Sequence, residues 1–416
     1  MKLQGSFTPP GDKSISHRIG LFALLAEGAC RVENFSPCDD CASTLAAVRQ
    51  LGARVERQEN LVKISGAEQA LRPGTVDCGN SGTTMRLLMG VLAGRPGEFL
   101  LKGDESLSRR PMQRVADPLN AMGARVRCEE GKPPVQITGK QLHGAEHNLA
   151  VASAQLKSAL LLAGIQADGE TRVIEPAPSR DHTELLFKAF GADIWRQEGA
   201  WCVKRSALSL PSDLSVPGDA SSAAFFICGA IITPGSRMEA RDTLLNPTRI
   251  GFLKVLERMG AQLEIIEKSH DPEPCGLVRA AFSPDLRGCR IEAREIPLLV
   301  DEVPILALAA TQAKGETVFH DVGELRIKES DRLGAIVTQL GAMGAKLAIN
   351  GDDLIVQGPS RLRVPERELE SYGDHRIAMT LAMAGVAAGQ MPEVHDAECA
   401  TISFPSFYAE LERLTA

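Results

Sequence analysis

The chain has 416 residues, of which 44% are hydrophobic and 24% are charged, close to the averages for globular proteins. Its 46 basic and 53 acidic residues give a formal net charge of -7, which argues against a nucleic-acid-binding protein, because such proteins carry a basic excess. The length exceeds that at which one hydrophobic core usually stops growing, so we expect two domains of roughly 200 residues each.

A short phrase recurs along the chain: an apolar residue, then Gly-Ala, then alternating apolar positions. Its glycines are Gly52, Gly123, Gly191, Gly260 and Gly344. Glycine fits the end of a helix, and alternating apolar positions fit a strand that follows it. Each copy therefore predicts a helix that ends in a glycine turn and leads into a strand.

Small or polar segments that open helix-periodic apolar runs are interleaved with these glycines. They begin at Gly11, Gly79, Ala152, Gly218, Val300 and Gly373. Six helix starts and five Gly-Ala closures predict six copies of one α/β unit, the last cut short near residue 414. We expect an N-terminal strand, about residues 2–8, to complete the last copy.

The tripeptide at residues 10–12, Pro-Gly-Asp, reappears at residues 217–219, the first and fourth helix starts. This repetition divides the six units into two lobes of three. We predict a first lobe over residues 10–217 and a second lobe formed by residues 1–9 and 218–416. The sequence contains neither G-x-G nor a P-loop motif, which disfavours nucleotide cofactors.

Several of these helix starts combine backbone N–H groups with nearby cations, an arrangement that attracts anions. Lys13 and Arg18 lie within two turns of the first start, with the Ser14 hydroxyl between them. Arg110 and Arg180 lie beside turns or helix starts, where a guanidinium can bind phosphate in a bidentate manner. The alternative for any single start is ordinary N-capping or a solvated basic helix end.

Two segments of the second lobe carry carboxylates beside cations or before a buried run. Lys328 and Arg332 are four residues apart, so a helix would place both on one face with Glu329 beside them. They would either share an anion or belong to an exposed, salt-bridged helix. Asp301 precedes an apolar run, where it can cap a helix or accept a proton from a substrate hydroxyl.

The cysteines and histidines do not predict a metal site. Ten cysteines are scattered without the spacing of a disulfide scaffold, which favours free thiols in a reducing compartment. Cys38 and Cys41 form a C-x-x-C pair, but no second pair or histidine lies at zinc-site spacing. No apolar run approaches the ~18 residues of a membrane span, and the start lacks a signal-peptide pattern. We expect a cytoplasmic protein without a metal or a membrane partner.

Six motifs in chain order together resemble the 5-enolpyruvylshikimate-3-phosphate synthase family. They are residues 10–18 (PGDKSISHR), 80–83 (NSGT), 110–112 (RPM), 153–155 (SAQ), 328–332 (KESDR) and 374–376 (DHR). The resemblance covers nearly the whole chain. It implies an α/β protein, a two-lobed inside-out α/β barrel in which each lobe has three βαβαββ units that close over the substrates.

The resemblance also implies the reaction and its residues. The enolpyruvyl group of phosphoenolpyruvate is transferred to the 5-hydroxyl of 3-phosphoshikimate, phosphate is released, and no cofactor is used; this is a step toward chorismate and the aromatic amino acids. A monomer that binds no nucleic acid is expected. The implied 3-phosphoshikimate contacts are Lys13, Ser14, Arg18, Ser153, Ala154, Gln155, Arg180, Asp301 and Lys328. The implied phosphoenolpyruvate contacts are Lys13, Gly82, Arg110, Gln155, Arg332 and Arg376.

Catalysis is assigned to Asp301, Glu329 and Lys13. Asp301 would take the hydroxyl proton, Glu329 would protonate the methylene carbon, and Lys13 would stabilise the departing phosphate. The chain departs from many family members at three positions: Ile402 replaces a lysine, Glu324 an asparagine, and Ala154 a second serine.

Two other functions remain as alternatives. One is UDP-N-acetylglucosamine enolpyruvyl transferase, although that family carries Lys-Asn at residues 13–14 and a loop cysteine that residues 109–111 lack. The other is a non-catalytic phosphate-binding protein built from the same repeat.

Overall fold

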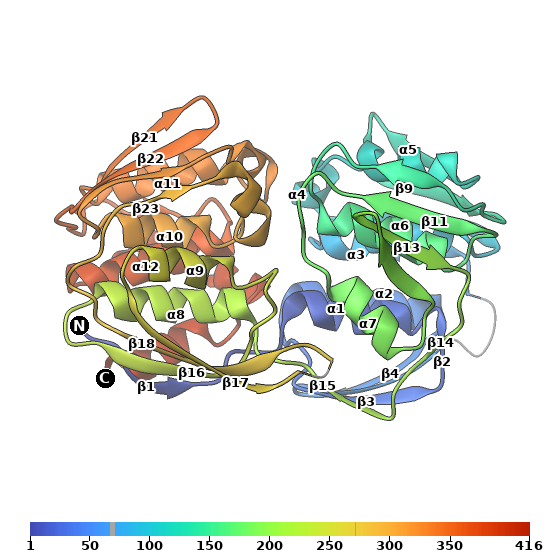
Figure 1. Cartoon of the computed structure of the whole chain (residues 1–416), viewed down its shortest axis with the longest axis horizontal. Helices are drawn as coiled ribbons and strands as arrows, with labels where there is room; N and C mark the ends of the chain where they lie inside the picture. The colour runs from blue at the N-terminus through green and yellow to red at the C-terminus, as the bar shows by residue number, and fades with distance from the viewer. Residues whose placement is uncertain (67–70, 271) are drawn as a thin grey trace. The chain divides into compact units, whose positions relative to one another are not determined.

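The computed structural model describes residues 1–66, 71–270 and 272–416. The chain forms two compact units (Figure 1). We call Gly11–Val216 the first unit, and Met1–Pro10 together with Pro217–Ala416 the second unit. The second unit is therefore discontinuous in sequence.

The described residues of the first unit form three four-stranded sheets and one two-stranded sheet. One four-stranded sheet has the spatial order β15 (Asp213–Ser215), β3 (Ala29–Glu33), β5 (Leu61–Ser65) and β4 (Arg54–Gln58). The second has the order β6 (Gly74–Asp77), β7 (Gly97–Lys102), β9 (Lys132–Gly139) and β8 (Arg125–Glu129). The third has the order β10 (Glu146–Asn148), β11 (Glu170–Ile174), β13 (Ala200–Lys204) and β12 (Ile194–Gln197). The two-stranded sheet pairs β14 (Leu208–Ser209) with β2 (Ala26–Glu27). Each four-stranded sheet has one parallel pair followed by two antiparallel pairs.

The helices of the first unit differ in how deeply they are buried. They are α1 (Lys13–Phe22), α2 (Asp39–Leu51), α3 (Gly82–Ala93), α4 (Glu105–Ser108), α5 (Gln113–Ala121), α6 (Ala154–Gly164) and α7 (His182–Ala189). α3 packs against both α1 and α6, and most residues of these three helices are buried. A helix that is apolar on nearly every side needs neighbours all round it, which is why these helices lie inside and the sheets outside.

The second unit repeats this plan with a shortened last copy. Its sheets are β1 (Gln4–Phe7), β16 (Arg237–Leu244), β18 (Cys275–Ala281) and β17 (Gln262–Ser269); β19 (Arg290–Ile291), β20 (Gly315–Phe319), β22 (Asp353–Gly358) and β21 (Lys346–Asn350); and the pair β23 (Leu369–Glu370) and β24 (Val394–His395). The predicted α/β class built from repeated units is thus confirmed, and the sixth copy lacks the antiparallel hairpin of the others.

Three helices pack against one another at the centre of the second unit: α8 (Ala220–Ile232), α10 (Val303–Ala310) and α12 (His375–Ala388). Every residue of α8 and α10 is buried. The other helices are α9 (Gly251–Arg258), α11 (Arg332–Ala342), α13 (Phe407–Thr415) and the 3-10 turns Ala293–Leu298, Gly323–Ile327 and Ala397–Ile402.

The five Gly-Ala closures behave as predicted. Their glycines all have positive φ angles: 119° at Gly52, 99° at Gly123, 86° at Gly191, 89° at Gly260 and 93° at Gly344. Glycine adopts this left-handed conformation without the steric cost that a Cβ imposes. A strand follows each closure, so the repeated phrase marks the end of a helix and the start of an outer hairpin.

The expected place of the N-terminal strand is wrong. β1 does not complete the last copy but pairs in parallel with β16 of the fourth copy. In the same way, β15 near residue 214 pairs in parallel with β3 of the first copy. Each unit therefore receives the edge strand of its first sheet from the segment that lies next to the chain crossing.

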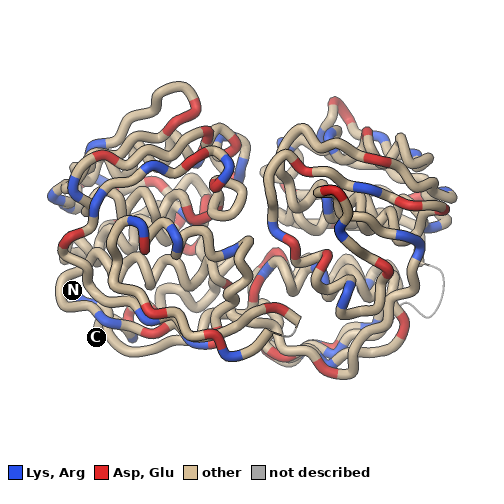
Figure 2. Tube along the Cα trace, viewed as in Figure 1, with Lys and Arg blue, Asp and Glu red and all other residues tan. Residues whose placement is uncertain are grey.

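Acidic and basic residues are interspersed along both units (Figure 2). This distribution matches the modest net charge of -7 and shows no long block of one sign. In the described parts of the chain, no helix has both the length and the apolar character that crossing a membrane requires.

Candidate active site

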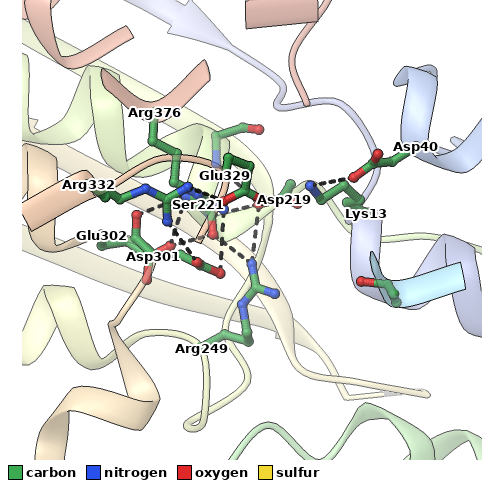
Figure 3. A network of polar contacts seen from close by, with 12 residues as sticks. Lys13, Asp40, Asp219, Ser221, Arg249, Asp301, Glu302, Glu329, Arg332 and Arg376 are labelled. Carbon is green, nitrogen blue, oxygen red and sulfur yellow. Dashed lines mark hydrogen bonds and ion pairs between the residues drawn. The ribbon is translucent and has the colours of Figure 1, made fainter. Parts of the chain in front are cut away.

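Lys13 is held through both its side chain and its backbone. It is the first residue of α1, whose start is capped when the Asp12 carboxylate accepts the Ile15 N–H at 2.9 Å. The Nζ of Lys13 lies 3.1 Å from Oδ2 of Asp40 (Figure 3). The Cys41 thiol donates to the Lys13 carbonyl at 3.5 Å. The start of α2 thus fixes the ammonium group at the start of α1.

Arg18, one turn further along α1, is 2% exposed and has a fixed guanidinium. Its Nε donates to Thr183 Oγ1 at 2.7 Å, its Nη1 to the Ser14 carbonyl at 2.9 Å and its Nη2 to Ser158 Oγ at 2.8 Å. These partners come from three helices of the first unit. Their contacts hold a buried positive charge close to the α1 start.

His17 lies between these two cations in sequence and is fully buried. Burial lowers its pKa well below the usual value, and the charges of Lys13 and Arg18 lower it further. The imidazole is therefore neutral near pH 7 and adds no positive charge to this helix start. Its Nδ1 lies 2.6 Å from Thr44 Oγ1, a contact that ties α1 to α2.

Two guanidinium groups converge on the start of α3. Ser81 caps this helix by accepting the Thr84 N–H at 3.1 Å, and Gly82 is its first residue. A Cβ placed on Gly82 would lie 3.0 Å from Nη1 of Arg86 and 3.2 Å from Nη1 of Arg110. Backbone N–H groups, a helix dipole and two cations therefore meet at one point, which favours an anion.

Gln155 connects this start to that of α6. Its Oε1 accepts from Nη1 of Arg86 at 2.6 Å, and its Nε2 donates to Thr83 Oγ1 at 2.9 Å. Arg110 is held by Asn80 Oδ1 at 2.9 Å. Arg86 was not predicted as a site residue, although its position four residues after Gly82 places it one helical turn away, on the same face.

The remaining candidates of the first unit lie at two further helix starts. Ser153 caps α6 through a 3.4 Å bond from the Leu156 N–H, and Ala154 is the first residue of that helix. Arg180 is half-buried in the loop that precedes α7. The candidates of this unit therefore lie at the starts of α1, α3 and α6 and before α7, and the bond from Arg18 to Ser158 joins α1 to α6.

In the second unit the candidates form one connected cluster around Arg332 (Figure 3). Arg332 is fully buried at the start of α11. Its Nε lies 2.9 Å from Asp374 Oδ2, its Nη2 2.6 Å from Glu329 Oε2 and its Nη1 3.5 Å from Asp301 Oδ1. Burial by itself lowers the pKa of Arg332, but the three carboxylates, Asp374 foremost, more than offset this and raise it.

Asp301 bridges two arginines. Its Oδ2 lies 3.5 Å from Nη2 of Arg376, and its carbonyl oxygen accepts from Nη1 of Arg376 at 3.0 Å. The side chain of Asp301 is 18% exposed and that of Glu329 is 21% exposed, whereas Arg332 is covered. Two partly accessible carboxylates thus flank a buried guanidinium, an arrangement suited to proton transfer beside a bound anion.

Lys328 lies at the edge of this cluster, not on the helix that carries Arg332. The segment is a 3-10 turn, Gly323–Ile327, followed by a bend, and α11 begins only at Arg332. The expectation of one helical face shared at four-residue spacing is therefore wrong. Burial lowers the pKa of Lys328, while Asp301 opposes the shift.

Asp374 has a second role that its position as a helix cap did not reveal. It caps α12 by accepting the Arg376 N–H at 2.9 Å, and it also holds Arg332. The capping pattern in the sequence predicts the first contact. The second depends on packing between α11 and α12, which has no local signal.

Known proteins resemble this chain along its whole length. The family model described as EPSP synthase (3-phosphoshikimate 1-carboxyvinyltransferase) matches residues 1–411. The 3-phosphoshikimate 1-carboxyvinyltransferase of Desulforudis audaxviator is 45% identical over 419 residues, which cover 99% of this chain and 97% of the relative. The protein of the same name from Lactiplantibacillus plantarum is 42% identical over 420 residues, 99% of this chain and 96% of the relative.

Solved structures agree with these matches. EPSP synthase from Acinetobacter baumannii has a TM-score of 0.86 and 40% identity, with 99% of this chain and 96% of that chain covered. The enolpyruvyl transferase NikO from Streptomyces tendae, at 19% identity and a TM-score of 0.78, shares the fold over 100% of this chain and 95% of its own. On this evidence the chain belongs to the EPSP synthase (3-phosphoshikimate 1-carboxyvinyltransferase) family.

Proposed function

We propose that the chain transfers the enolpyruvyl group of phosphoenolpyruvate to the 5-hydroxyl of 3-phosphoshikimate and releases phosphate, a step of the shikimate pathway toward chorismate. Both substrates are multiply charged anions, which accounts for guanidinium and ammonium groups at helix starts in a protein of net charge -7. The observation that carries the assignment is the family match over residues 1–411.

The proposed 3-phosphoshikimate contacts are Lys13, Ser14, Arg18, Ser153, Ala154, Gln155, Arg180, Asp301 and Lys328. The buried, fixed guanidinium of Arg18 supports this role, since a preorganised cation loses little side-chain entropy on binding. The proposed phosphoenolpyruvate contacts are Lys13, Gly82, Arg110, Gln155, Arg332 and Arg376. The approach of two guanidinium groups to Gly82 supports this second set.

The addition step needs two proton transfers on different atoms. The 5-hydroxyl must lose a proton as its oxygen bonds to C2 of phosphoenolpyruvate, and C3 must gain one. We assign the first transfer to Asp301 and the second to Glu329, because both carboxylates are partly accessible and both contact Arg332. When phosphate leaves and the double bond reforms, C3 returns a proton, which the Glu329 carboxylate accepts.

Lys13 completes the proposal by stabilising the negative charge that develops on the departing phosphate. Its ion pair with Asp40 holds the ammonium group at the α1 start. The proposed residues lie within one chain, so the activity requires no second copy, and we propose a monomer. Ten free cysteines support a reducing, cytoplasmic location.

The assignment is tested by phosphate release from phosphoenolpyruvate with each of two acceptors, 3-phosphoshikimate and UDP-N-acetylglucosamine. We expect release only with 3-phosphoshikimate. Release only with the sugar nucleotide would identify the other enolpyruvyl transferase. Tight binding of both substrates without turnover would instead indicate a non-catalytic binding protein.

The roles of the two carboxylates are tested by Asp301→Asn and Glu329→Gln. Each variant should reduce kcat by about a hundredfold or more, while the Kd of each substrate, measured by calorimetry, changes far less. Glu316→Gln, at an exposed position of strand β20, is the control and should match wild type. Wild-type turnover in either active-site variant would remove that residue from the mechanism.

A further inference from the structure

A buried chain of polar side chains leads to Arg376 in the second unit (Figure 3). Arg249, in the turn before α9, donates from Nη2 to Ser221 Oγ at 2.9 Å. The Ser221 hydroxyl in turn donates to Oε1 of Glu302. The same oxygen of Glu302 lies 3.7 Å from Nη1 of Arg376. The contacts therefore run from one arginine to the other through a hydroxyl and a carboxylate.

This chain is almost completely shielded from solvent. Glu302 is 1% exposed, Arg249 2%, Ser221 4% and Arg376 6%. Its members come from the starts of α8, α10 and α12 and from the turn before α9. Asp219, which caps α8, also accepts from Arg249 at 3.3 Å, so two carboxylates face the two arginines.

Such a network is a poor way to gain stability. Buried charges lose their hydration, and well-packed apolar side chains of similar size often stabilise a core as well or better. What the network does provide is a fixed orientation. Directional hydrogen bonds join Arg249 to Ser221 and Ser221 to Glu302, and an ion pair at 3.7 Å joins Glu302 to Arg376. The last residue of the network is Arg376, which we propose as a phosphoenolpyruvate contact.

We propose that Arg249, Ser221 and Glu302 are positioning residues that orient the guanidinium of Arg376 for the anionic donor substrate. The inference rests on the proposed function of Arg376. Ser221 fixes the Glu302 carboxylate, and Glu302 together with the Asp301 carbonyl restrains Nη1 of Arg376. None of the three positioning residues needs to contact the substrate.

The direction in which Glu302→Gln changes the KM for phosphoenolpyruvate distinguishes positioning from a simple charge effect. Glu302→Gln keeps an oxygen for Ser221 but removes a negative charge 3.7 Å from Arg376. If the charge alone mattered, its loss would strengthen the attraction for an anion and lower the KM for phosphoenolpyruvate. If orientation matters, the same variant raises that KM.

The experiment compares Glu302→Gln and Ser221→Ala with Ser222→Ala. Ser222 is the next residue of α8 and, like Ser221, is 4% exposed, so it controls for loss of a buried hydroxyl. We expect about a tenfold higher KM for phosphoenolpyruvate in both test variants. In both, kcat should stay within about threefold of wild type, and Ser222→Ala should behave as wild type. Should Glu302→Gln fail to fold, Ser221→Ala decides, because it leaves every charge in place.

A double-mutant cycle with Arg376→Lys identifies the residue through which the network acts. Lysine keeps the charge but cannot form the same contacts. In the Arg376→Lys background, Ser221→Ala should raise the KM no further. Additive effects would overturn the proposal, as would an unchanged or lower KM in both single variants.

The cycle also separates this proposal from the function on which it rests. A wild-type KM for phosphoenolpyruvate in Arg376→Lys would show that the assigned role of Arg376 is wrong. A raised KM in Arg376→Lys, with none in Ser221→Ala or Glu302→Gln, would leave that role intact and remove only the positioning network.

Discussion

At the scale of single residues, Arg332 shows how neighbouring carboxylates stabilise a buried positive charge. A guanidinium with no exposed surface would be costly to fold around, but three carboxylates lie within 3.5 Å of its nitrogens. Removing one partner from such a cluster usually destabilises more than the cluster itself stabilises. The acid and base assigned to the reaction, Asp301 and Glu329, therefore also maintain the fold locally.

Gly82 permits the most direct single-residue prediction. In Gly82→Ala the new Cβ would lie 3.0 Å from Arg86 and 3.2 Å from Arg110, so one or both guanidinium groups must shift. We expect the KM for phosphoenolpyruvate to rise about tenfold or more, with a small change in the KM for 3-phosphoshikimate. Steady-state kinetics with each substrate varied in turn measures both.

Gly341→Ala in α11 is the matched control, since a Cβ there would meet no atom within 4 Å. It should leave both KM values unchanged and raise the free energy of unfolding by about 0.5–1 kcal/mol, because alanine favours a helix over glycine. Equal KM values in the two variants would contradict a donor site at the α3 start.

Sequence alone could point to some site residues but not to others. Lys13, Arg18 and Arg110 were found because they follow turns or helix starts, where cations are informative. Arg86 and Arg249 were not predicted. The spacing of Arg86 from Gly82 places it near the α3 start but does not reveal its partner, and Arg249, a lone arginine in a turn, has no local signal. Arg86 contacts Gln155, which is 69 residues away in the sequence, and Arg249 contacts Ser221, which is 28 residues away. Only these distant partners show that the two arginines belong to the site.

At the scale of elements, one buried ion triad joins α6 to α7. Lys157 lies 2.8 Å from both Glu175 and Glu184, and its side chain is 1% exposed. Burial lowers the pKa of Lys157, but the two glutamates more than offset this and raise it. Its contribution to stability is therefore fully present below the usual lysine pKa of about 10.4 and is lost only at higher pH.

Lys157→Met should destabilise the protein by about 3–5 kcal/mol at neutral pH, because it leaves Glu184 buried without its counterion. Burial already raises the pKa of Glu184, and loss of Lys157 removes the charge that opposes this shift. When the pKa of a carboxyl group is higher in the folded state than in the unfolded state, the protein becomes less stable as the pH rises. The loss of unfolding free energy caused by Lys157→Met should therefore be smaller at about pH 5 than at about pH 8. Urea unfolding at the two pH values measures it.

Lys157→Met/Glu184→Gln tests the cause of that loss. Glutamine removes the unpaired charge at nearly constant volume, so the double variant should recover part of the lost stability at pH 8 and show a weaker pH dependence. A double variant less stable than Lys157→Met would show that packing, not charge, explains the effect.

At the scale of the whole molecule, the chain leaves the second unit after β1 and returns to it near residue 217. Phe7 on β1 is 4% exposed and packs 4.9 Å from the ring of Phe226 on α8. Phe7→Ala should cost about 3–5 kcal/mol. Hydrogen exchange should then rise in β1, β16 and α13 of the second unit and stay unchanged in the sheets of the first unit.

Leu214→Ala provides the reverse case. Leu214 is 8% exposed on β15, which pairs with β3 of the first unit as β1 pairs with β16 of the second. Its substitution should increase exchange in the first unit alone. Equal increases in both units from either substitution would show that the two units unfold as one.

The sequence by itself determined the α/β class, the six helix starts, the five glycine closures and the family. These features are encoded locally: a glycine with positive φ, a cap, and a periodic apolar face act within one turn or one hairpin. The tertiary structure alone decided where β1 pairs and that Asp374 and Glu302 hold arginines of the cluster. These features depend on contacts between segments far apart in the chain, and only packing brings those segments together.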